Sequence, residues 1–202
     1  MIALFLHVSG AIGTFVSLGI WLFGLAALRR ATLVEQVRAL AWLIVIASPL
    51  MVFSVLFLGL GGFEMALSTW GIFTPWIAVS LVSVLLIGPV GAFILDPRMR
   101  TILAETRDPA DGPLPAVLFR RVHDPILFAL VSTLTIMLLG IVFLMTTKPS
   151  LVLSLLVMGI ALTFGLCISL WLWSTRRRRA FQKVNSLEAD TFLEQSIWTR
   201  RW

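Results

Sequence analysis

Five long runs of uncharged, mostly apolar residues constrain the fold of this chain more than any other feature. They cover residues 2–28, 39–60, 75–95, 125–145 and 151–173, and none contains Asp, Glu, Lys or Arg. A run of roughly 18 or more such residues can cross a hydrocarbon layer about 30 Å thick. Because lipid offers the backbone no hydrogen-bond partner, each run is expected to be helical, and the alternation typical of a membrane β-barrel is absent. The sequence predicts an all-α bundle of five transmembrane helices within residues 1–175.

The composition excludes an ordinary soluble domain. Of 202 residues, 59% are hydrophobic and 13% charged, whereas soluble domains are about half apolar and one quarter charged. The first run lacks a basic segment before it and is too long for a secretory signal, so we expect it to be a retained helix. Cys167 is the single cysteine, which excludes an intramolecular disulfide.

The positions of the cations predict how the chain is oriented. Every Lys and Arg except Lys148 lies in the loops after the first and third runs or in the residues after the fifth run. Because cations in short loops resist translocation, we expect the N-terminus outside and the C-terminus in the cytoplasm, in a multi-pass protein of a prokaryotic cell membrane. The net charge of +6 then indicates contact with anionic lipid headgroups at the cytoplasmic face, not nucleic-acid binding.

The segments between the runs give further predictions. The residues "RDPADGPLP" prevent a continuous helix in the loop 96–124, but 114–122 can form a short helix at the membrane surface. The glycines of "GLGGFEMALSTWG", residues 59–71, are expected to end the second helix. Trp70 and Trp76 are expected to anchor this side at the membrane interface. Residues 176–202 form a basic cytoplasmic tail, with a short helix predicted from the capping pattern "NSLE".

Two stripes of small residues predict close helix packing. In the first and fifth runs, small residues recur every four positions: Ser9, Gly13 and Ser17, and Ala161, Gly165 and Ser169. Such stripes allow two helix backbones to approach closely. We expect the first and fifth helices to pack tightly, within one copy or between copies in a homo-oligomer or a larger membrane complex.

His7 is the one titratable residue near the start of the first helix. An imidazole in lipid is costly, so it should face the bundle and find a partner. Three hypotheses remain open. The ring is structural and hydrogen-bonded to Ser, Thr or a backbone carbonyl; it ligates haem iron or another metal; or it shuttles protons.

A second ligand for His7 has to lie in the same half of the membrane. His123 is predicted at the opposite surface, roughly 20 Å or more away. Met145 and Met65 are therefore the candidates to pair with His7. Arg120, Arg121, His123 and Asp124 instead predict a charge cluster at the inner surface.

The segments "FLHVSGAIGTFVSLG", residues 5–19, and "VFLMTTKP", residues 142–149, carry a resemblance. They resemble a family of predicted integral membrane proteins, domain of unknown function 2269, and are distantly similar to the copper-resistance protein D membrane group. In relatives that hold haem, a histidine in the first helix is a ligand candidate, and His7 matches that place. The resemblance therefore makes His7 a candidate ligand for haem b, while the sequence itself identifies no cofactor.

The residues support three hypotheses for function. The sequence has no Walker, Rossmann or zinc motif, and no acid in the helices to complete a Ser-His-acid set, so an enzyme is not the favoured interpretation. The first hypothesis is a structural or assembly component that acts through helix packing. The second is a haem-b-binding redox or tetrapyrrole-handling protein that uses His7. The third is a small-solute transporter that uses helix breaks at Pro49 and Pro89.

Overall fold

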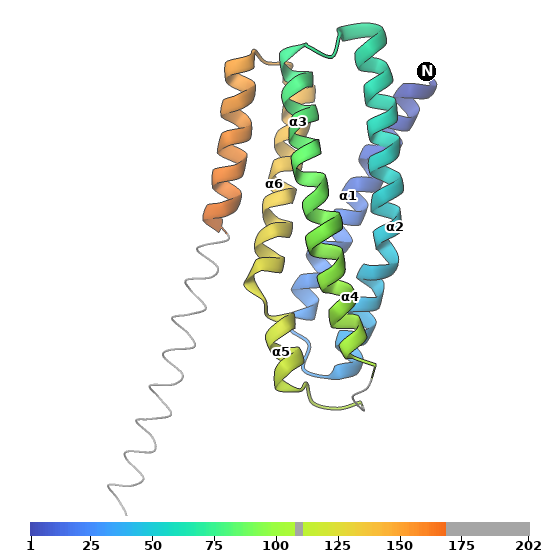
Figure 1. The fold of residues 1–202 in the computed structure, drawn as a ribbon, viewed down its shortest axis with the longest axis vertical. Coiled ribbons are helices and arrows are strands. Elements are labelled where there is room, and N and C mark those ends of the chain that lie inside the picture. Colours follow the sequence, from blue (N-terminus) through green and yellow to red (C-terminus); the bar gives the residue numbers. More distant parts are fainter. Residues whose placement is uncertain (108–110, 169–202) are drawn as a thin grey trace, which may run out of the picture.

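The computed structural model describes residues 1–107 and 111–168, and what it describes is helical apart from short connections. Figure 1 shows long helices running side by side along the longest axis. The α-helices are α1 (Ile2–Leu28), α2 (Val34–Met65), α3 (Pro75–Val90), α4 (Asp96–Glu105), α5 (Ala116–Val122), α6 (Pro125–Thr147) and the unlabelled last helix (Leu151–Ile168). Two π-helical turns, η1 (Ala66–Trp70) and η2 (Gly91–Leu95), continue α2 and α3.

The prediction of five membrane-spanning helices in an all-α fold is confirmed. Within the described residues, five helical segments are long and apolar enough to cross a membrane. The second begins at Val34 and the third ends at Glu105, beyond the uncharged runs, because a helix can continue into the polar interface once its apolar part has crossed. The short helix expected at 114–122 is confirmed as α5. The tail 176–202 lies outside the described residues.

The closest helix contact joins α1 and α2, which run antiparallel along their length (Figure 1). Gly10 of α1 lies against the backbone of Ser54, where an added Cβ would be 2.6 Å from the carbonyl oxygen. At Gly61 of α2, an added Cβ would be 2.6 Å from the backbone nitrogen of His7. Real Cβ atoms do not come this close, so glycine is required wherever these two backbones touch.

Both small-residue stripes pack against the neighbouring helix along the chain. In α1, Gly13 faces the side chain of Ser54, and Ser17 is fully buried with its hydroxyl donating to the Gly13 carbonyl at 2.9 Å, while Ser9 is half-buried. In the last helix, Gly165 faces the backbone of Thr133 in α6.

The expected pairing of the first and fifth helices is therefore wrong within one copy. Ala161 faces Gly140 of α6, and Figure 1 places the last helix at the edge of the bundle beside α6, with α1 on the other side. A short connection favours an antiparallel pair between consecutive helices, and each stripe serves such a pair. Ser169 lies outside the described residues.

The expectation that the glycines of residues 59–71 end the second helix is right for Gly71, which follows η1 with a φ of 83°, and wrong for the other three glycines. The helix α2 continues through Gly59, Gly61 and Gly62 as far as Met65. A glycine inside a helix costs about 1 kcal/mol relative to alanine. Here the close approach to α1 at Gly61 and Gly62 offsets that cost, and both glycines lie beside His7.

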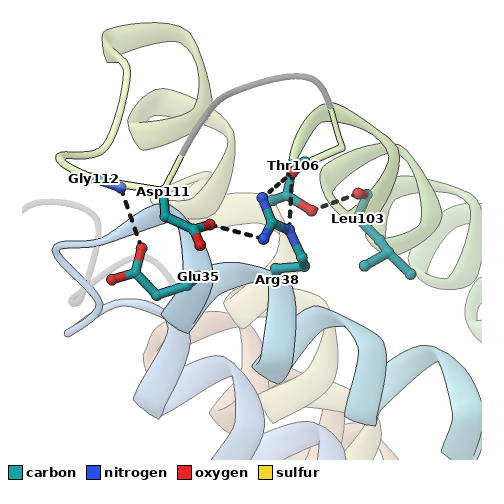
Figure 2. A network of polar contacts seen from close by, with 6 residues as sticks. All are labelled: Glu35, Arg38, Leu103, Thr106, Asp111 and Gly112. Carbon is teal, nitrogen blue, oxygen red and sulfur yellow. Dashed lines mark hydrogen bonds and ion pairs between the residues drawn. The ribbon is translucent and has the colours of Figure 1, made fainter.

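Polar contacts tie the loops together at the end of the bundle opposite the N-terminus. Arg38 donates through Nε and Nη2 to the Thr106 carbonyl, at 3.0 and 2.8 Å, and forms an ion pair with Asp111 at 2.8 Å (Figure 2). The backbone N–H of Gly112 donates to Glu35 at 3.3 Å. These contacts fix the start of α2 against the segment that follows α4.

We expect Gly61→Ala to destabilise the protein and Gly59→Ala, on the same helix, to be harmless. The alanine at 61 forces the two backbones apart, at a cost of about 2 kcal/mol, whereas a Cβ at 59 meets nothing within 4 Å. Thermal unfolding in detergent, followed by circular dichroism, measures the difference. Equal melting temperatures for the two variants would contradict the close backbone contact.

Candidate functional site

A cavity of about 280 Å³, open on one side to the surface of the bundle, lies between helices near the N-terminal end of α1. Residues of α1, α2, η1, α3 and α6 form its wall. The wall is almost entirely apolar and includes the aromatic side chains of Phe15, Phe63, Trp70 and Trp76. Apart from His7, no titratable side chain lines it. The cavity suits an uncharged, largely apolar guest.

His7 reaches the cavity from the second turn of α1. Its Nδ1 lies 2.8 Å from the carbonyl oxygen of Leu58 in α2. Because a carbonyl oxygen only accepts, Nδ1 must be the donor, so the neutral ring carries its proton there and presents Nε2 as an acceptor. Gly62 makes room for the ring, since an added Cβ would lie 2.8 Å from Nδ1.

The hypothesis of a hydrogen-bonded histidine agrees with this geometry, because Nδ1 has a backbone carbonyl as its partner. The same bond is the arrangement that orients metal-ligating or acceptor imidazoles in general, since it fixes the tautomer and leaves the other nitrogen available. Among the described residues, Nε2 has no hydrogen-bond partner. His7 therefore combines a structural bond with one open nitrogen beside the cavity.

Ser80 of α3 is the second polar feature of the cavity wall. The residue is only 1% exposed, and its Oγ has no hydrogen-bond partner. Two other buried serines donate to the carbonyl four residues earlier: Ser83 does so to Val79 at 2.7 Å, and Ser154 to Ser150 at 2.9 Å. An unpaired buried hydroxyl costs about 1–3 kcal/mol. Neighbouring atoms enclose this Oγ, so a guest gains a hydrogen bond from Ser80 when the side chain rotates toward the cavity.

The two methionines proposed to accompany His7 both line the same cavity. Met145 extends from the end of α6, and Met65 from the end of α2. His123 lies at the other end of the molecule, where its Nε2 is 3.1 Å from the carbonyl of Arg29, just after α1. The 27 residues of α1 span about 40 Å, so the two histidines are separated as expected.

Trp70 and Trp76 line the cavity and contact each other, and Lys148 packs on Trp70. Trp70 and Trp76 meet edge to face, with ring centroids 5.7 Å apart. The Nζ of Lys148 lies 4.1 Å from the centroid of the Trp70 ring. Trp76 is only 8% exposed and lines the cavity, so the expectation that it is a surface anchor is wrong.

A shallow groove adjoins the cavity on the outside of the bundle. Its volume is about 590 Å³, and it shares His7, Ala11, Phe15 and Val142 with the cavity wall. Its remaining lining residues belong to α1 and are exposed and apolar: Val8, Ile12 and Val16. In a membrane this surface faces lipid, so the groove gives lateral access to His7.

The four residues predicted as a charge cluster lie near α5 but bond to other elements. Arg121 pairs with Glu105 of α4 at 2.7 Å. Asp124 caps α6 by accepting from the N–H of Ile126 and pairs with Arg98 at 3.3 Å.

The other two residues of the predicted charge cluster, His123 and Arg120, also form no reactive site in the described part of the chain. His123 stacks on Phe119 and approaches carbonyl oxygens with both ring nitrogens, while Arg120 is exposed. Among the described residues, no group of three His, Cys, Asp or Glu side chains is placed to hold a metal ion. These contacts join α1, α4, α5 and α6 rather than form a reactive site.

Sequence reasoning missed Ser80 and the cavity itself. A serine in an apolar helix usually bonds to its own backbone, so the sequence gives no signal that this hydroxyl is unpaired. The cavity depends on how five segments meet, which no single run reveals. The glycines beside His7 were a usable signal, since small residues opposite a histidine leave space for its ring.

We expect Ser80→Ala to leave the stability of the ligand-free protein unchanged or to raise it by up to about 1 kcal/mol, since it removes an unpaired buried hydroxyl. Ser83→Ala, three residues further along α3, should lower stability by about 0.5–1.5 kcal/mol, because Ser83 loses its bond to Val79. Thermal unfolding of both variants in the same detergent measures this. If Ser80→Ala lost more stability than Ser83→Ala, the Ser80 hydroxyl would already have a hydrogen-bond partner in the protein.

Comparison with known proteins gives one family. Residues 1–149 match the family described as "Predicted integral membrane protein (DUF2269)". No curated protein and no solved structure matches the chain.

Proposed function

The chain belongs to the DUF2269 family of predicted integral membrane proteins, and from that premise we propose that it is a membrane-embedded binding protein. It takes up a small, largely apolar molecule from the bilayer and holds it in the cavity beside His7. The observation that carries this proposal is an apolar cavity beside two polar atoms, Nε2 of His7 and Oγ of Ser80, for which the described residues supply no hydrogen-bond partner.

The size of the cavity supports binding over a packing defect. Protein interiors are close-packed and contain few voids larger than a water molecule. A volume of about 280 Å³ approaches the lower end of small-molecule sites, about 300–1,000 Å³. The apolar wall makes filling by water unfavourable, and an apolar guest removes that cost.

The donor set partly supports haem, but the volume does not. His7 and Met145 line one cavity, as a His–Met pair of axial ligands requires. Haem has roughly 40 non-hydrogen atoms and exceeds the drug-sized ligands of pockets of about 300–1,000 Å³. A cavity of about 280 Å³ that is open on one side covers only part of such a molecule. The geometry favours a smaller guest.

The other two functional hypotheses gain less from the structure. The stripes that suggested an assembly role are used inside one copy, by α1 with α2 and by the last helix with α6. Pro49 and Pro89, which suggested transport, are both exposed and do not line the cavity. The cavity is thus the feature with most support for a function.

We expect 2-fluoronaphthalene to bind the purified chain saturably and to lose this binding in Ala11→Phe. Ala11 lines both the cavity and its groove, so a phenylalanine there fills the space. Fluorine NMR line broadening, titrated in detergent micelles, measures the affinity.

The matched control is Ala26→Phe, which adds the same ring at an exposed position of α1. This variant should bind the probe as the wild type does. Equal broadening in all three proteins would show partition into the micelle alone and would refute a binding site at the cavity.

The orientation is a second proposal, supported by the charges. The arginines of the described residues lie at the end of the bundle opposite His7, in the loops and in the adjoining helix turns, and Lys148 lies at the His7 end. Because cations in short loops stay in the cytoplasm, the N-terminus and the cavity then face the outside of the cell membrane.

Reporters fused after Trp202 of the full chain test the orientation. Green fluorescent protein should fluoresce there, and alkaline phosphatase should be inactive, because the first folds in the cytoplasm and the second requires oxidation outside it. The reverse pair of results would place the arginine-rich end outside and overturn the assignment.

A further inference from the structure

We propose that the molecule held in the cavity is uncharged and carries a hydroxyl group on a flat aromatic body, as a phenol or naphthol does. This inference rests on the proposed binding function and names the chemical class of its ligand. It follows from the protonation of His7, the unpaired hydroxyl of Ser80 and the composition of the cavity wall.

His7 requires a hydrogen-bond donor from its ligand. The Leu58 carbonyl holds the proton on Nδ1, so Nε2 of the neutral ring presents a lone pair and no hydrogen. A ketone, an ether or an ester offers only acceptors and leaves that lone pair unpaired. A ligand O–H satisfies it.

Ser80 accommodates the same kind of group. Its hydroxyl rotates freely and can both donate and accept, and in the described residues nothing pairs with it. A ligand hydroxyl that donates to His7 still has lone pairs to accept from a second donor. The wall therefore supplies two complementary partners: His7, which only accepts, and Ser80, which can donate.

The remainder of the wall selects charge and shape. No acidic side chain, lysine or arginine lines the cavity, so an ionised ligand would be buried without a counter-ion, which is strongly unfavourable. Four aromatic side chains, those of Phe15, Phe63, Trp70 and Trp76, contribute to the wall. Aromatic rings favour stacked or edge-on contact with another flat ring.

The test compares 6-fluoro-2-naphthol with its methyl ether, which has the same rings but cannot donate. Fluorine NMR titrations in micelles give the ratio of the two affinities for each protein variant. Comparison of this ratio between variants cancels the different partition of the two probes into the micelle. We expect the wild-type ratio to favour the naphthol about tenfold.

Three variants locate the effect. His7→Leu should reduce the ratio about tenfold, and Ser80→Ala should reduce it severalfold. His123→Gln, at the opposite end of the bundle, should leave it unchanged. Because Ser80→Ala removes no hydrogen bond from the protein, it tests the inference even if His7→Leu fails to fold.

The outcomes separate this inference from the function on which it rests. If naphthol and ether bind saturably with ratios that do not change in His7→Leu or Ser80→Ala, the cavity binds apolar molecules without reading a hydroxyl. The inference then fails and the proposed function stands. If neither probe nor 2-fluoronaphthalene binds saturably, both fail.

Discussion

The direct contact between the backbones of α1 and α2 is the constraint on which the site depends. In a membrane, lipid is as apolar as the helices, so helices associate through close packing and hydrogen bonds rather than through burial from water. Gly10 and Gly61 permit that packing. The short distance brings the Leu58 carbonyl within reach of His7, which fixes the ring and determines which nitrogen faces outward.

The two ends of the bundle are closed in different ways. At the end opposite the N-terminus, side-chain and backbone hydrogen bonds join the loops, with Arg38 bonded to Thr106 and Asp111 (Figure 2). At the His7 end, the closing contacts are between rings and a cation, Trp70 with Trp76 and Lys148. The hydrogen bonds at the first end depend strongly on distance and angle, so they hold the loops in one arrangement. The ring and cation contacts at the His7 end leave space between α1, α3 and α6, and the cavity lies in this space.

The errors of sequence analysis share one cause. The position of Trp76 is typical of an interface anchor, yet its side chain is buried between helices. Glycines 59, 61 and 62 are typical of a helix end, yet they lie inside α2. Interface and helix-end signals are local, whereas these residues respond to helices distant in the sequence. The small-residue stripes did predict close packing. They did not identify the partner helices, because a stripe allows any other helix to approach closely.

The sequence by itself determined the number of helices, their approximate limits and the uneven distribution of arginines, because crossing lipid depends only on the sum of apolar residues along one run. It also placed Met145 in the same half as His7, because distance along a helix is fixed at about 1.5 Å per residue. The tertiary structure decided which face of each helix turns inward. In runs that are apolar on every side, no periodicity marks that face, so only packing could pair His7 with Leu58 and leave Ser80 unpaired.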